Sequence, residues 1–214
     1  MFAISTVWNG WRHQKVESLV AEVKGLGFEG LELSFGLPAE MVQGIRELVR
    51  DGRIKVLSLH NYCPAPILPG GEKLSYDVLP LSSRLERERK WAVRQTIRTL
   101  ETAKAVGASA VVLHMGRVSH RTLSSRLITL AERGKLQSKE SQKIKEKLLK
   151  KREARKRPFL EQALKSLESI AKSAEELKVK VGIENRYYPE EIPSLEEINL
   201  LLERCPSPSV GYWH

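Results

Sequence analysis

Cysteine is scarce in this sequence. Cys63 and Cys205 are the only two among 214 residues, and they lie far apart without CxxC or Cys/His spacing. This spacing therefore suggests neither a disulfide framework nor a zinc finger. No apolar stretch approaches the roughly 20 residues that a membrane helix needs, and the N-terminal segment lacks the basic-then-apolar order of a signal peptide. We expect a cytoplasmic protein with plain thiols and no membrane partner.

Most of the chain also lacks net charge, although the total is +10. Between Arg133 and Arg157, twelve lysines and arginines stand against three glutamates, so this segment holds +9 of the +10. The rest of the chain is nearly neutral, whereas a nucleic-acid-binding domain should have a basic face. A solvated helical face is the simplest interpretation of the segment. Nucleic-acid contact is less favoured, because the segment is poor in aromatic residues that stack on bases.

Short β-branched runs alternate with longer amphipathic stretches along the chain. The pattern predicts six strands, at residues 2–7, 31–35, 55–60, 109–115, 180–185 and 210–214. It predicts five connecting helices, at residues 16–27, 38–52, 85–106, 160–177 and 195–205. Such alternation implies an α/β fold with parallel strands and right-handed crossovers. We expect a single domain over residues 1–214.

A doubly wound sheet and a (β/α)8 barrel both fit this alternation, and the strand ends separate them. The first strand is followed by WNGWRH and not by a GxGxxG loop, which argues against a dinucleotide-binding fold. Polar residues recur where the strands finish, at Glu32, Ser34, His60, His114, Glu184, Asn185 and His214. In a barrel these carboxyl ends converge on one mouth, where active sites are built. The barrel is therefore the better interpretation.

The connection after the fourth strand is far longer than the typical 2–6 residues. It covers residues 118–157 and consists mainly of strong helix formers. We interpret it as a basic helical insertion on the mouth side of the barrel, over or beside the site.

His60, His114 and Glu184 are the candidate metal ligands. A single histidine at a strand end is more often a hydrogen-bonded structural residue, and Glu184 has a buried ion pair with Arg186 as its simpler interpretation. Three strand-end groups of ligand type in separate βα units are harder to attribute to packing. Glu32 either orients a histidine or is exposed at its strand end.

Other residues near the strand ends are candidates for substrate binding. Asn185 and Arg186 are suited to a hydroxyl or a phosphate, although an ion pair of Arg186 with a nearby glutamate is equally plausible. Trp8 and Tyr62 follow strands, where aromatic rings form a wall for a sugar ring. Packing at the barrel rim explains these aromatic residues as well.

Several segments, in this order, resemble the xylose isomerase-like TIM-barrel superfamily: GFEGLELSFGL, LSLHNYCP, LSSRLERERKWAV, GASAVVLHMG, VGIENR and VGYWH. That superfamily contains sugar and sugar-phosphate isomerases and epimerases together with the apurinic-site endonuclease IV. LHNYCP and VLHMG resemble segments whose histidines bind zinc in the endonucleases. VGIENR resembles the segment whose glutamate ligates metal in both groups. The resemblance thus implies metal ligation by His60, His114 and Glu184.

The resemblance implies a sugar or sugar-phosphate isomerase or epimerase that uses a divalent ion, Mn, Mg, Co or Zn. Glu184 would ligate the metal and act as one acid/base in enediolate proton transfer. Two alternatives stay open. One is an endonuclease IV-like zinc phosphodiesterase acting on abasic DNA, and the other is a non-catalytic barrel fragment.

In relatives the sixth strand continues past a segment like GYWH into an aspartate ligand and two further βα units. Here the sequence ends at His214. The resemblance therefore implies an incomplete barrel of six βα strands, truncated at the sixth strand, with little or no turnover. Open edges at the first and sixth strands predict self-association, as a homo-oligomer or as aggregates.

Overall fold

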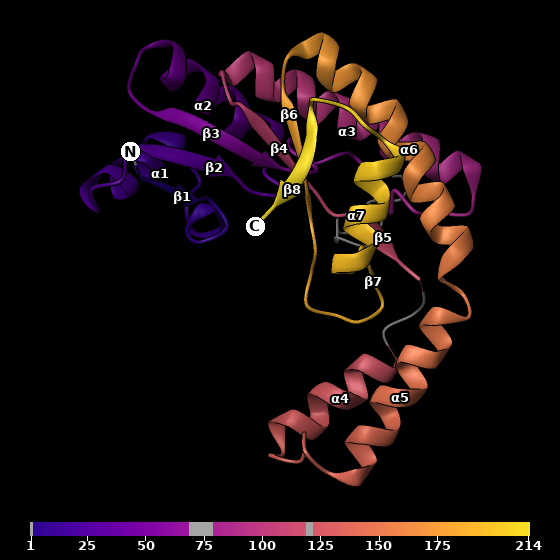
Figure 1. Ribbon diagram of the computed structural model, residues 1–214. Helices are drawn as coiled ribbons and strands as arrows, with labels where there is room; N and C mark the ends of the chain where they lie inside the picture. The colour runs from indigo at the N-terminus through magenta and orange to yellow at the C-terminus, as the bar shows by residue number, and fades with distance from the viewer. Residues whose placement is uncertain (1, 69–78, 119–121) are drawn as a thin grey trace.

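The computed structural model describes residues 2–68, 79–118 and 122–214. The six expected parallel strands are confirmed, and they form one curved sheet in the order β1-β2-β3-β4-β6-β8 (Figure 1). Their bounds are Ala3–Ser5, Gly30–Leu33, Lys55–His60, Ala110–Leu113, Lys180–Glu184 and Val210–Trp213. This order follows the chain, as in a barrel wall, and does not reverse as in a doubly wound sheet. The architecture is a partial (β/α)8 barrel.

The parallel register brings the carboxyl ends of the central strands to one edge of the sheet. His60 at the end of β3 pairs with Val112 of β4, and Leu113 of β4 pairs with Ile183 of β6. Glu184, the last residue of β6, pairs with Trp213 of β8. The polar residues at these strand ends therefore share one side of the sheet.

Five helices connect the strands at nearly the predicted positions. They are α1 (Val16–Gly25), α2 (Ala39–Arg50), α3 (Glu86–Val106), α6 (Lys156–Leu177) and α7 (Leu195–Arg204). Each buries an apolar stripe at helical spacing, as Val42, Ile45 and Leu48 do in α2. Gly107 follows the last residue of α3, and its φ of 73° forms a left-handed cap that glycine adopts without strain. Figure 1 shows α3 and α6 side by side along the outer side of the sheet.

A second, two-stranded sheet was not predicted. It pairs β5 (Gly116–Arg117) with β7 (Glu191–Ile192) in antiparallel fashion. Gly116 has a φ of 117°, and a Cβ atom there would collide with the side chain of Ser82. Two-residue strands carry too little periodicity for a sequence pattern to reveal them.

The insertion after the fourth strand is helical, as expected, and it forms an arm made of α4 (Thr122–Glu132) and α5 (Lys139–Glu153). We call this pair the helical arm. Residues 119–121, part of the predicted insertion, lie outside the described residues. A small apolar cluster holds the two helices together, and it consists of Leu127, Leu130, Ile144 and Leu148. Figure 1 shows the helical arm extending away from the sheet on the side of the strand carboxyl ends, so it does not cover them.

A buried ion pair fastens the helical arm to the barrel. Arg152 at the end of α5 is 7% exposed, and its two terminal nitrogens lie 2.6 and 2.5 Å from the two carboxylate oxygens of Glu197 in α7. The same guanidinium donates a hydrogen bond to the carbonyl of Glu191, at 3.0 Å. Glu197 also caps α7 by accepting from the backbone N–H of Ser194. Both charges are therefore satisfied although they are buried.

No helix in the described ranges is long and apolar enough to cross a membrane. Both cysteines are free and buried, in agreement with their interpretation as plain thiols.

Replacing Arg152 with methionine should lower the free energy of unfolding by about 3–5 kcal/mol, because the buried Glu197 carboxylate would keep only Lys156, 3.8 Å away, as a positively charged neighbour. Urea denaturation followed by circular dichroism measures this loss. The matched control is Arg157→Met, which removes an exposed ion pair with Glu161 and should cost less than about 1 kcal/mol. Equal losses in the two variants would contradict the anchoring role of Arg152.

Candidate metal centre

Three ligand-type side chains meet at the carboxyl edge of the sheet. His60 ends β3, His114 follows the last residue of β4, and Glu184 ends β6. The Nε2 atoms of His60 and His114 lie 3.3 and 2.6 Å from the same carboxylate oxygen of Glu184. The three candidate ligand atoms all lie within 4.8 Å of one another. The structure thus brings together the residues that the sequence selected as metal ligands.

Glu32 at β2 lies behind His60. Its carboxylate is 3.2 Å from His60 Nδ1, and its other oxygen accepts a hydrogen bond of 3.0 Å from Ser58 Oγ. With Nδ1 held by a carboxylate, the Nε2 atom of His60 is directed toward Glu184, as in many metal-binding histidines. Of the two interpretations of Glu32, the structure supports the orienting one. Ser58 was not selected from the sequence, although its position two residues before His60 places both on one face of β3.

The charges of the cluster are strongly coupled. Burial alone would lower the pKa of His60, but hydrogen bonds to Glu184 and Glu32 outweigh burial and raise it to about 9. Hydrogen bonds from His114 and His60 lower the pKa of Glu184 to about 2. Burial, opposed by Glu184 but reinforced by the charges of Arg186 and His60, lowers the pKa of His114. Without a metal ion, the cluster at neutral pH therefore holds one imidazolium, one neutral imidazole and a carboxylate.

The donor set fits a divalent cation. Two imidazole nitrogens and one carboxylate oxygen suit zinc, cobalt and manganese, and magnesium to a lesser degree. Three protein ligands also leave coordination positions for water or substrate, which is typical of catalytic sites. A cavity of about 560 Å³ opens over the cluster and is lined by His60, His114, Glu184, Asn185, Arg186 and Tyr187.

Arg186 and Asn185 line this cavity, and both are held by neighbouring side chains. Arg186 forms an ion pair of 2.7 Å with Glu191. Such a pair with a nearby glutamate is the alternative to substrate binding that the sequence left open, and the pair lies within the protein and not at its surface. Arg117 contacts the same carboxylate oxygen at 3.2 Å. The amide oxygen of Asn185 accepts a hydrogen bond of 2.8 Å from the hydroxyl of Tyr212. No periodic pattern in the sequence marks Arg117 or Tyr212 as partners of these residues.

Tyr62 does not line the cavity, which corrects its expected place in a substrate wall. Its side chain is 5% exposed, and its hydroxyl donates a hydrogen bond of 2.5 Å to the carbonyl of Leu79. Burial accordingly raises the pKa of the phenol. The ring belongs to the hydrophobic core beneath the strand ends.

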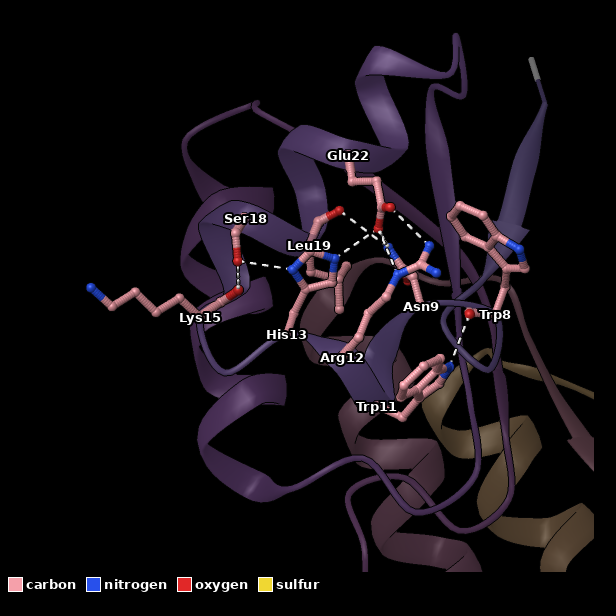
Figure 2. Close-up of polar contacts among 9 residues, drawn as sticks. All are labelled: Trp8, Asn9, Trp11, Arg12, His13, Lys15, Ser18, Leu19 and Glu22. Atoms are coloured by element: carbon pink, nitrogen blue, oxygen red, sulfur yellow. Dashed lines mark hydrogen bonds and ion pairs between the residues drawn. The ribbon is translucent and has the colours of Figure 1, made fainter.

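Trp8 is not among the cavity residues and lies in a separate polar cluster after β1 (Figure 2). Its ring stacks against the guanidinium of Arg12 at 4.3 Å. His13 and Arg12 both contact Glu22 of α1, at 2.7 and 2.8 Å. The hydrogen bond from His13 is the main reason why the pKa of Glu22 falls to about 2. This cluster orders the loop between β1 and α1, and its His–Glu pair offers a matched control for the metal centre.

In the metal-free protein, His60 should titrate with a midpoint near pH 9. Replacing Glu184 with glutamine should lower this midpoint by about 1–3 pH units, because an adjacent negative charge is removed. Imidazole NMR signals recorded between pH 5 and 10 measure the midpoint. The control Glu22→Gln alters the partner of His13 and should leave His60 unchanged, whereas an unshifted His60 in Glu184→Gln would contradict the proposed coupling.

The same coupling sets the pH dependence of stability. The pKa of His60 is raised by folding, from 6.5 to about 9. Its contribution to the free energy of unfolding is therefore fully present below about pH 6.5 and is lost as the pH rises through about 9. Urea denaturation across this range should show the decline in wild type and a smaller decline in Glu184→Gln.

Comparison with known proteins agrees with the fold. A family model described as xylose isomerase-like TIM barrel matches residues 20–213. Among curated proteins, none matches the chain. Solved structures of other proteins share the fold. An L-ribulose 3-epimerase has a TM-score of 0.65 at 16% identity, over 99% of this chain and 59% of its own. The 3-keto-D-glucoside 4-epimerase YcjR from E. coli has a TM-score of 0.60 at 15% identity, over 94% of this chain and 63% of its own.

The third structure, an IOLI protein with a bound zinc atom, has a TM-score of 0.63 at 12% identity, over 99% of this chain and 62% of its own. At such identities the likeness concerns the fold alone. The chain spans about three-fifths of the length of these structures. The family match extends over most of the chain and includes all three residues of the candidate metal centre. The protein belongs to the xylose isomerase-like TIM barrel family.

Proposed function

We propose that this chain carries the metal centre of a divalent-metal-dependent isomerase or epimerase acting on a sugar or sugar phosphate. One observation carries the proposal. Two histidine nitrogens and a glutamate oxygen lie within 4.8 Å of one another at the strand carboxyl ends of a xylose isomerase-like barrel. Catalytic residues of such barrels come from these strand ends.

His60, His114 and Glu184 would hold the ion, with Glu32 orienting His60. When bound, a divalent cation supplies a positive charge that polarises a substrate carbonyl and stabilises an adjacent enediolate. Glu184 is the proposed acid/base for transfer of the proton next to the carbonyl. Its low pKa keeps the carboxylate ionised at neutral pH, as a proton acceptor must be, while the same shift lowers its basicity.

Asn185 and Arg186 are the proposed contacts for substrate hydroxyl or phosphate groups, since both line the cavity. Their partners Tyr212 and Glu191 fix the two side chains before substrate arrives, which reduces the ordering cost of binding. Trp8 remains a proposed aromatic contact at the rim, because its loop follows β1 at the same edge of the sheet.

An endonuclease IV-like zinc phosphodiesterase is the second candidate, and the two imidazole ligands favour it because imidazole suits zinc. The near-neutral charge of the chain outside residues 133–157 disfavours it. A barrel that binds without catalysis is the third candidate. Metal stoichiometry and reaction type separate the three.

Metal affinity tests the centre directly. Titration calorimetry with Mn²⁺, Co²⁺ and Zn²⁺ should detect one site, and His114→Ala should weaken binding by at least about 100-fold. Glu32→Gln should weaken it by about 10–100-fold, since it disturbs the orientation of a ligand and not the ligand itself. The control His13→Ala removes a histidine that pairs with a glutamate elsewhere and should bind normally. Equal weakening in His13→Ala would refute the assignment, and about three zinc ions per chain would favour the phosphodiesterase.

Proton exchange tests the reaction. In D₂O, the metal-loaded protein should incorporate deuterium next to the carbonyl of ketoses or ketose phosphates, observed by NMR. This exchange needs only the proton transfer at Glu184 and not the full turnover, which is expected to be little or absent. Glu184→Gln should slow this exchange by about 10²–10⁴-fold, the usual contribution of a general acid/base. Glu22→Gln is the matched control and should exchange at the wild-type rate. Cleavage of an abasic-site oligonucleotide without any ketose exchange would overturn the proposal.

A further inference from the structure

The helical arm carries a row of lysines that the proposed function does not use. Lys139, Lys143, Lys147 and Lys150 are all exposed, and their spacing of four, four and three residues places them on one face of α5. The opposite face, with Ile144, is buried against α4. We call these four residues the lysine row.

An arginine from α4 extends this positive surface. A hollow of about 400 Å³ between the two helices is lined by Arg126 together with Lys139, Lys143 and Lys147. Its one acidic lining residue is Glu140, which pairs with Arg126 at 3.3 Å. Among the residues that the structure describes, no carboxylate forms an ion pair with the lysine row.

The row is not accounted for by helix stability or solubility alone. Like charges four residues apart on a helix repel one another and destabilise it. Exposed Glu146 lies on the same face, three residues after Lys143 and four before Lys150, and offsets part of this repulsion. The face still carries four positive charges against this one negative charge, and the excess suits a partner that supplies negative charges.

The arm also restricts the kind of anion that it can bind. The segment 118–157 contains no Phe, Trp or Tyr, so it offers no ring for stacking on bases or for anchoring at a membrane interface. Two of the three aliphatic side chains of α5, Ile144 and Leu148, are packed against α4, and Leu149, 56% exposed, is a single side chain and not an apolar face. An interfacial helix needs such a face free to enter lipid. These features favour contact with phosphates alone.

The dimensions agree with a nucleic-acid backbone. From Lys139 to Lys150 the row covers 11 residue steps, about 16 Å at 1.5 Å per step. One strand of a duplex carries about five phosphates over that length. From this match we infer that the helical arm binds the phosphate backbone of double-stranded nucleic acid without reading its bases.

The anchoring of the arm supports this role. The buried pair of Arg152 with Glu197 fixes the end of α5 to α7, so the row is held in place before a partner arrives. Figure 1 shows the arm extending away from the sheet, and none of the four lysines lines the cavity over the metal centre. Binding by the row is therefore independent of the proposed isomerase chemistry.

Fluorescence anisotropy with a labelled 20-base-pair DNA duplex, at salt concentrations from 50 to 200 mM, tests the inference. Four phosphate contacts predict that log affinity falls with log salt with a slope of about −3.6 or steeper. The variant K139Q/K143Q/K147Q/K150Q should bind the duplex at least 10-fold more weakly at 50 mM salt. Its slope of log affinity against log salt should be less negative by about 3–4. Glutamine keeps the helix propensity of lysine, and circular dichroism verifies the fold.

The matched control K24Q/K104Q/K165Q/K172Q removes the same charge from exposed lysines of α1, α3 and α6. It should bind within 2-fold of wild type. Duplex RNA should bind similarly to duplex DNA, because the same phosphates are contacted. The inference is overturned if both quadruple variants lower the affinity for the duplex equally. It is also overturned if single strands, phosphatidylserine vesicles or polyglutamate bind as tightly as the duplex. His114→Ala should bind the duplex normally, so failure of the metal centre and failure of the row remain distinguishable.

Discussion

The carboxylate of Glu184 is the interaction on which the candidate site depends. It reaches both histidine Nε2 atoms with one oxygen, and it can do so because parallel pairing brings the ends of β3, β4 and β6 to the same edge. The sheet therefore fixes the distances within the cluster, and Glu32 and Ser58 fix the orientation of His60. A site built on strand ends in this way keeps its geometry without relying on mobile loops.

A second polar network connects the helical arm to the cavity. Glu191 in β7 accepts from Arg186 and Arg117 through its carboxylate, while its carbonyl accepts from Arg152 of the arm. The short β5–β7 sheet holds these groups in register. An arginine beside the metal centre and an arginine at the base of the arm thus share one residue. The arm is an integrated part of the barrel and not a loosely attached appendage.

Most of the architecture could be predicted from periodicity, because strands and helices with a buried apolar stripe leave a regular pattern in the sequence. His60, His114 and Glu184 could be selected as strand-end residues for the same reason. The burial of the Tyr62 side chain could not be predicted, since a ring that follows a strand can turn toward the core or toward the mouth of the barrel. Pairing of Arg152 with Glu197 and the direction of the arm depend on contacts between distant segments, which leave no local pattern.

The shared hydrogen bonds of His60 have a consequence for metal uptake. At neutral pH the ring carries a proton because Glu184 and Glu32 stabilise its charge, so the proton occupies the place that a cation would take. An incoming ion must expel it, and binding is then a competition between two positive species for the same nitrogen. Acidity would release the ion and alkalinity would retain it, which makes occupancy of the centre responsive to the surrounding proton concentration.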